Sequence, residues 1–175
     1  MFAIRSGGEP LLYAFKKTSR SPHPIDDIIA GPETSYTLAY PTDRETAFSV
    51  RYRDDPFWDI ELHEGKRGGV LKAKVSIEKG GGFSLSIPSY DHYGRIEHRQ
   101  PFLGLKGDKF RWMRASPVGQ YACWQVVEGR AVRKAARWKI RYGRGKGLLQ
   151  VNKAFYDERE LLLASAIGAA VSKFY

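Results

Sequence analysis

The sequence of 175 residues contains a single cysteine, Cys123, and a single asparagine, Asn152. One cysteine excludes an intrachain disulfide, and Asn152 is followed by Lys-Ala, so it is no N-glycosylation acceptor. The first residues contain no apolar stretch long enough for the core of a signal peptide. These absences predict a protein of the reducing cytoplasm, with Cys123 as a small buried side chain in a strand.

No stretch resembles a membrane span. Residues 161–172 are uncharged and apolar on every side of a helix, which predicts a helix over about 158–173. At ~1.5 Å per residue this helix is about 24 Å long, and its uncharged part is shorter than the ~20 residues that a bilayer requires. Asp157 as N-cap and Glu160 as its capping-box partner predict where the helix begins. We therefore expect the rest of the chain to wrap around this helix.

Recognisable catalytic and metal-binding motifs are missing as well. The four histidines form neither an HExxH motif nor a paired Cys/His pattern, and no GxSxG nucleophile motif is present. The glycines of 143–147 lack the spacing of a phosphate-binding loop and are interpreted as a basic hairpin turn. The sequence thus predicts no catalytic residue, no metal site and no cofactor.

Acidic residues are scarce in the second half of the chain. Residues 1–90 contain 12 Lys and Arg against 12 Asp and Glu, whereas residues 91–175 contain 17 against seven and carry the entire net charge of +10. Such asymmetry is typical of a protein with an anionic partner, although it also keeps a protein soluble.

Short alternating segments dominate the chain before residue 157. Residues 47–53 and 57–63 alternate apolar and polar side chains with period two, as in half-buried strands. Residues 18–32 and 89–101 are predicted as loops. A length of 175 residues predicts one domain over 1–175. About ten or eleven strands at spacings of roughly 8–12 residues suggest an all-β barrel or sandwich. We expect a mainly β fold, a closed antiparallel barrel of about 10–12 strands that encloses the C-terminal helix.

The strongest surface feature is a run of seven cations without an acidic residue in positions 133–146. Alternation in 135–142 places Ala136 and Trp138 on one face and the cations on the other, about 7 Å apart at ~3.3 Å per residue. Such a row suits phosphates or clustered lipid headgroups, and a charged edge that prevents aggregation is the alternative. The predicted ligand-binding residues are Arg133, Lys134, Arg137, Lys139, Arg141, Arg144 and Lys146.

Five segments of the second half resemble the C-terminal half of tubby C-terminal-like domains, and especially small fungal tubby-like and LURP-one-related members. They are Phe110–Arg114, Ala122–Trp124, Ala136–Tyr142, Gly147–Asn152 and Asp157–Gly168. The resemblance implies a twelve-stranded antiparallel barrel around a hydrophobic C-terminal helix. The best-known relatives bind phosphoinositides, so it also implies a lipid partner, but it assigns no binding residue in this chain.

The sequence therefore predicts a monomeric, non-enzymatic binding module. Its partner is expected to be anionic membrane lipid, with a phosphoinositide headgroup as the ligand, met from the cytoplasm at the membrane periphery. Two alternatives remain open, a nucleic-acid-binding protein and a structural domain that meets an acidic protein. The tryptophans in the patterned strands are interpreted as core residues, which counts against base stacking.

Overall fold

The computed structural model describes residues 11–16, 27–32, 46–53, 59–65, 69–78, 82–97, 99–116, 120–141 and 146–171. The strands are β1 (Leu11–Lys16), β2 (Asp27–Pro32), β3 (Thr46–Arg53), β4 (Asp59–Glu64), β5 (Leu71–Ile77), β6 (Phe83–Ile87), β7 (His92–Ile96), β8 (Phe102–Leu103), β9 (Lys109–Ser116), β10 (Gln120–Val127), β11 (Arg130–Arg141) and β12 (Lys146–Val151). The 3₁₀ segments η1 (Pro88–Tyr90) and η2 (Lys153–Glu158) and the helix α1 (Arg159–Val171) complete the described elements.

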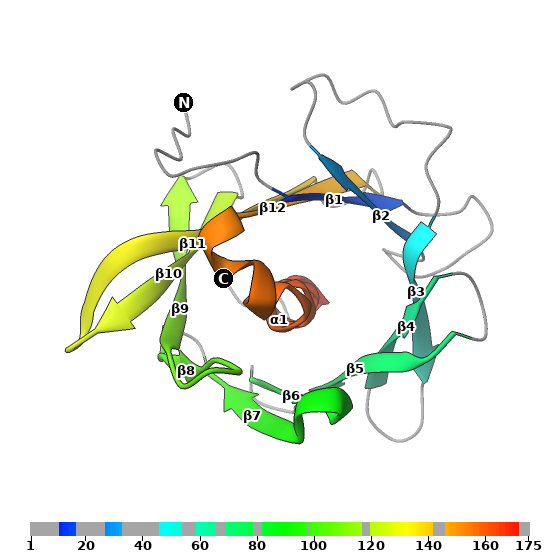
Figure 1. The fold of residues 1–175 in the computed structure, drawn as a ribbon, viewed down its shortest axis with the longest axis horizontal. Coiled ribbons are helices and arrows are strands. Elements are labelled where there is room, and N and C mark those ends of the chain that lie inside the picture. Colours follow the sequence, from blue (N-terminus) through cyan, green and yellow to red (C-terminus); the bar gives the residue numbers. More distant parts are fainter. Residues whose placement is uncertain are drawn as a thin grey trace.

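All twelve strands belong to one antiparallel sheet with the order β7-β6-β5-β4-β3-β2-β1-β12-β11-β10-β9-β8. β1 pairs with both β2 and β12, so the beginning and the end of the chain meet in the middle of the sheet. Figure 1 shows the sheet curling around α1. The mainly β architecture and the C-terminal helix that the sequence predicts are confirmed.

The prediction of a closed barrel is wrong. β7 and β8 are the two ends of the strand order, and no ladder joins them within the described residues. β8 has only two residues, and Pro101 directly before it has no backbone N–H to donate to a ladder. The sheet therefore curls around the helix and keeps two edge strands.

Two segments predicted as loops contain strands. β2 ends the segment 18–32, and β7 lies within 89–101, after η1. The polar and aromatic composition of β7 hides its strand character, because only Ile96 at its end is buried. As an edge strand with little buried surface, it has no apolar period for a sequence pattern to detect.

The helix α1 forms the centre of the core. Every residue from 161 to 168 is buried, and the helix contacts β5, β6, β11 and β12. Its one buried hydroxyl, on Ser165, donates to the carbonyl oxygen of Leu162 and accepts from Trp112 Nε1 at 2.9 Å in both cases. An apolar cylinder surrounded by a curled sheet removes its whole surface from water, which explains why no polar face is needed.

The helix α1 begins within one residue of its predicted start, but the predicted cap is wrong. Asn152 caps η2, since its side chain accepts a hydrogen bond from the backbone N–H of Ala154 at 3.0 Å. Asp157 lies inside η2 and bonds Lys106 Nζ, and α1 follows at Arg159. The capping side chain that the structure shows is thus that of Asn152, and it caps η2, the 3₁₀ segment through which the chain reaches α1. The expected helix end at 173 lies outside the described residues.

A candidate anion-binding face on β11

The strand β11 and the start of β12 hold most of the cations that the sequence predicts as a binding site. They are Arg133, Lys134, Arg137, Lys139, Arg141 and Lys146. For Lys139, Arg141 and Lys146 the structure describes the backbone alone, and Arg144 lies outside the described residues. The geometry of this site therefore rests on strand register and on the three described side chains.

A β-bulge interrupts the alternation of β11. Cys123 stands opposite Ala136, but the next residue, Trp124, stands opposite Lys134, so Ala135 is an extra residue in β11. Ala135 and Ala136 are both completely buried. A bulge shifts the side chains beyond it by one position, so strict alternation no longer assigns their faces.

The bulge brings Lys134 close to Arg137. The Nζ atom of Lys134 lies 5.0 Å from the centroid of the Trp124 ring. Partial burial, and secondarily the charge of Arg137, lower the pKa of Lys134. Arg137 Nη2 in turn donates to Gln120 Oε1 at 2.6 Å. Lys134 and Arg137 therefore lie near each other, Lys134 over the Trp124 ring and Arg137 hydrogen-bonded to the side-chain amide of Gln120.

Arg133 lies apart from this pair. Its guanidinium carbon is 6.0 Å from the centroid of the Phe155 ring in η2, and Phe155 meets Phe110 edge-on at 5.6 Å. The seven predicted cations therefore do not form one row. Arg133 is separated from Lys134 and Arg137 and lies at the end of the sheet where the chain enters α1.

Asn152 fixes the bulge that produces this division. Its Nδ2 donates to the carbonyl oxygen of Lys134 at 3.0 Å, and its backbone N–H donates to that of Ala135 at 2.8 Å. The same side chain caps η2. The sequence analysis predicts no capping role for Asn152. The sequence contains a signal for this role, because an asparagine directly before a helical segment is a preferred cap.

Strand pairing adds a cation that the sequence analysis missed. Lys146 stands directly opposite Arg141 of β11 on one side and directly opposite Lys16 of β1 on the other. Residues directly opposite in an antiparallel sheet share a face, and like charges in such positions destabilise the pairing. Lys139 and Arg137 follow Arg141 at two-residue intervals along β11. We call Lys16, Lys134, Arg137, Lys139, Arg141 and Lys146 the basic face.

Outside the basic face, His63 and Cys123 have structural roles. His63 Nε2 lies 3.0 Å from Glu61 Oε2, and its Nδ1 lies 3.0 Å from the carbonyl oxygen of Gly69, which ties β4 to the following turn. Complete burial raises the pKa of the Cys123 thiol well above its usual value. In the part of the chain that the structure describes, no three His, Cys, Asp or Glu residues are placed to hold a metal ion.

No helix among the described residues has the length and apolarity that crossing a membrane requires. No protein-family model, no curated protein and no solved structure matches the chain. The protein is therefore described by its own fold and site. It is a curled twelve-stranded antiparallel sheet around one buried helix, with basic residues opposite one another on β1, β12 and β11.

Proposed function

We propose that the protein is a non-enzymatic module that binds anionic membrane lipid, with phosphoinositide headgroups as ligands of the basic face. The observation that carries the proposal is the row Lys16–Lys146–Arg141, three cations directly opposite one another on neighbouring strands. Neighbouring like charges are unfavourable unless an anion lies between them. A headgroup with several phosphates supplies such an anion.

The arrangement of the tryptophans favours lipid over the alternative of nucleic acid. Trp112 and Trp138 are buried, and Trp124 is half-buried with Lys134 above its ring. Proteins that bind single strands combine cations with aromatic faces on which bases stack. Among the described tryptophans none offers such an open face. The resemblance to tubby-like domains points to the same class of ligand.

Vesicle flotation tests the proposal. The chain is mixed with phosphatidylcholine vesicles, with or without a phosphoinositide, at low and at high salt. We expect phosphoinositide-dependent flotation that weakens with salt. The variant Arg137→Ala/Lys139→Ala/Arg141→Ala should bind about 100-fold more weakly, because each cation near an anionic surface contributes ~1 kcal/mol.

A charge-matched control separates the basic face from net charge. Lys72→Ala/Arg95→Ala/Arg99→Ala removes the same number of cations from β5, β7 and the segment after β7. Thermal unfolding of both variants checks that they are folded. The proposal fails if the unmodified chain does not float, or if the two variants weaken binding equally.

A further inference from the structure

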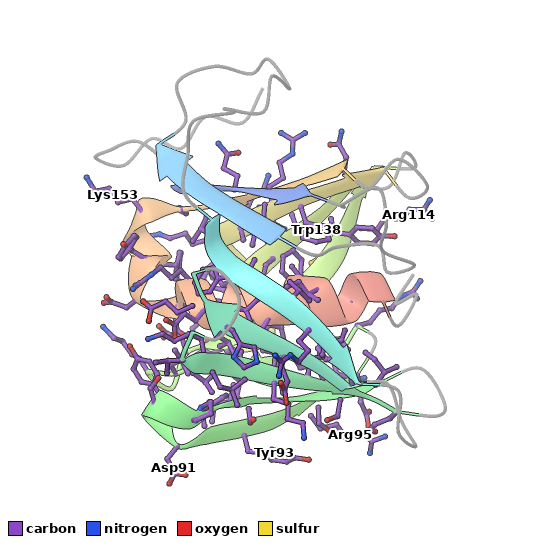
Figure 2. All side chains as sticks on the ribbon, turned by 90° about the vertical axis from the view of Figure 1, so that its right-hand side faces the viewer. Asp91, Tyr93, Arg95, Arg114, Trp138 and Lys153 are labelled. Carbon is purple, nitrogen blue, oxygen red and sulfur yellow. The ribbon has the colours of Figure 1, made fainter. Side chains whose placement is uncertain are left out.

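The inner and outer faces of β9, β10 and β11 follow from their core residues. Trp112, Cys123 and Ala136 stand directly opposite one another, and all three are buried in the core. Trp138, two residues after Ala136, lies inside the curled sheet in Figure 2. Because successive side chains of a strand point to opposite faces, the residues next to Trp112 and Cys123 in the sequence lie on the outer face.

Three cations lie around Trp124 on this outer face. Arg111 of β9 stands directly opposite Trp124 on one side, and Lys134 of β11 stands directly opposite it on the other. Residues directly opposite share a face, and Lys134 Nζ lies 5.0 Å from the centroid of the Trp124 ring. Arg137 stands opposite Ala122, the outer residue two positions before Trp124.

The three strands contain no acidic residue that would offset these cations. Asp108 before β9 and Glu128 after β10 lie about 10 and 13 Å along the strands from the row, at ~3.3 Å per residue. Ala122 and Val126 flank Trp124 on the outer face, and although neither belongs to the core they are only 1% and 6% exposed. The surroundings of Trp124 are therefore partly shielded from water, which strengthens the repulsion between like charges.

The guanidinium group of Arg111 has a donor that the protein leaves unused. Its Nε atom is buried and has no hydrogen-bond partner among the described residues. Buried polar groups are normally paired, so an unpaired donor on a cationic face indicates an acceptor from outside the chain. Arginine presents its N–H groups in a planar fork that fits the oxygen atoms of an anion.

The surroundings of Lys134 also favour an added anion. Partial burial lowers the pKa of Lys134, and the charge of Arg137 lowers it further. Both causes disfavour the charged amine, whereas a neighbouring anion favours it.

From these observations we infer that Arg111, Lys134 and Arg137 bind a phosphate group beside Trp124. Three cations exceed the single charge of a carboxylate, whereas a phosphate monoester carries close to two negative charges and three acceptor oxygens. Arg111 thereby becomes a ligand residue on β9, a strand outside the basic face.

The phosphate site is separate from the row Lys16–Lys146–Arg141. Lys134 and Arg141 are seven residues apart on β11, which corresponds to about 20 Å. The inference therefore does not depend on the proposed lipid binding, since the phosphate group of a headgroup and that of a soluble compound have the same chemistry.

The Nε–H resonance of Arg111 tests the site directly. The unmodified chain is isotopically labelled, and the resonance is assigned by through-bond correlation along the side chain. Inorganic phosphate is titrated at neutral pH and constant ionic strength, with acetate in a parallel titration. We expect a saturable shift with phosphate and a much smaller one with acetate. No shift with phosphate, or equal shifts with both anions, would overturn the phosphate site.

A conservative variant separates hydrogen bonding from charge. Arg111→Lys keeps the positive charge and removes the Nε–H donor. Followed through the Trp124 indole N–H resonance, its affinity for inorganic phosphate should fall about tenfold, because a hydrogen bond to a charged group is lost. Arg130→Lys, at an exposed position of β11, should bind like the unmodified chain. Thermal unfolding checks that both variants are folded, and equal affinities would show that Arg111 is not a ligand.

Vesicle flotation identifies the source of the phosphate. If Arg111→Lys floats less readily than Arg130→Lys on phosphoinositide vesicles, the phosphate group is that of a headgroup. If both variants float like the unmodified chain while Arg111→Lys binds inorganic phosphate more weakly, the phosphate group belongs to a soluble compound.

The two measurements keep the phosphate site and the proposed lipid binding apart. If the unmodified chain does not float but its Arg111 resonance shifts with phosphate, lipid binding is overturned and the phosphate site stands. If the chain floats and the resonance does not shift, the phosphate site is overturned and lipid binding stands.

Discussion

At the scale of single residues, the hydrogen bond between Trp112 and Ser165 joins the sheet to the helix inside an apolar core. Both side chains are buried, and the hydroxyl of Ser165 uses its donor for Leu162 and an acceptor position for the indole. Buried donors without a partner are costly, so this pair restricts how α1 can rotate inside the sheet.

Removing that hydroxyl should destabilise the protein. Ser165→Ala leaves the Trp112 indole N–H without its partner, and we expect the free energy of unfolding to fall by about 1–3 kcal/mol in urea denaturation. Trp112→Phe/Ser165→Ala should lose less than the sum of the single variants, because neither partner is left unpaired. Ser89→Ala on the exposed surface is the control. Additive losses would show that the bond does not couple the sheet to the helix.

At the scale of elements, β11 shows how a strand can depend on a distant side chain. Its bulge at Ala135 determines which cations come together, and Asn152 holds two consecutive carbonyl oxygens at that point. One residue thus fixes both the face of Lys134 and the start of η2.

Asn152→Ala should therefore disturb two elements at once. It removes the cap of η2 and leaves the carbonyl oxygen of Lys134 without the Asn152 amide donor, so we expect a loss of about 2 kcal/mol in the free energy of unfolding. Weaker phosphoinositide binding should accompany it, since the bulge positions Lys134. Lys153→Ala, an exposed neighbour, serves as the control in urea denaturation. Unchanged stability of Asn152→Ala would contradict the role assigned to this side chain.

The local sequence pattern predicts many of the strands and the helix, whereas other features of the fold depend on tertiary contacts. The alternation around Trp138 and the uncharged stretch of α1 reveal a strand and a buried helix, because side-chain period reports burial. The bulge at Ala135 has no sequence period that would predict it, because it depends on hydrogen bonds from Asn152. The opposition of Lys16 and Lys146 depends on pairing between the two ends of the chain, which no local window contains.

At the scale of the whole molecule, the buried face of the sheet packs against α1, as it would pack against a second sheet in a two-layer fold. Gly168 shows how closely they pack, since a Cβ atom there would lie 2.5 Å from the Phe83 ring. At the edge strand β8, the following turn is held to η2, where the Glu158 carboxylate accepts from the backbone N–H groups of Leu105 and Lys106. Helix and sheet should therefore fold as one unit.

A charge in the middle of α1 should abolish folding. Ala166 is 1% exposed, and an unpaired buried carboxylate costs several kcal/mol, which is comparable to the ~5–15 kcal/mol that stabilises a typical domain. Ala166→Glu should show no cooperative melting transition by circular dichroism. The matched substitution Ala154→Glu, at an exposed position in η2, should melt like the unmodified chain. A cooperatively melting Ala166→Glu protein would show that α1 is not the core.

The proposed lipid binding is tested most directly by competition between two polyanions. The unmodified chain is bound to phosphoinositide vesicles at low salt, and a single-stranded oligonucleotide is added at equal phosphate concentration. We expect the chain to stay with the vesicles and to be released by rising salt, because a headgroup bound between the cations of the basic face replaces bulk counterions. Transfer of the chain to the oligonucleotide, or no vesicle binding before its addition, would contradict the proposed lipid binding.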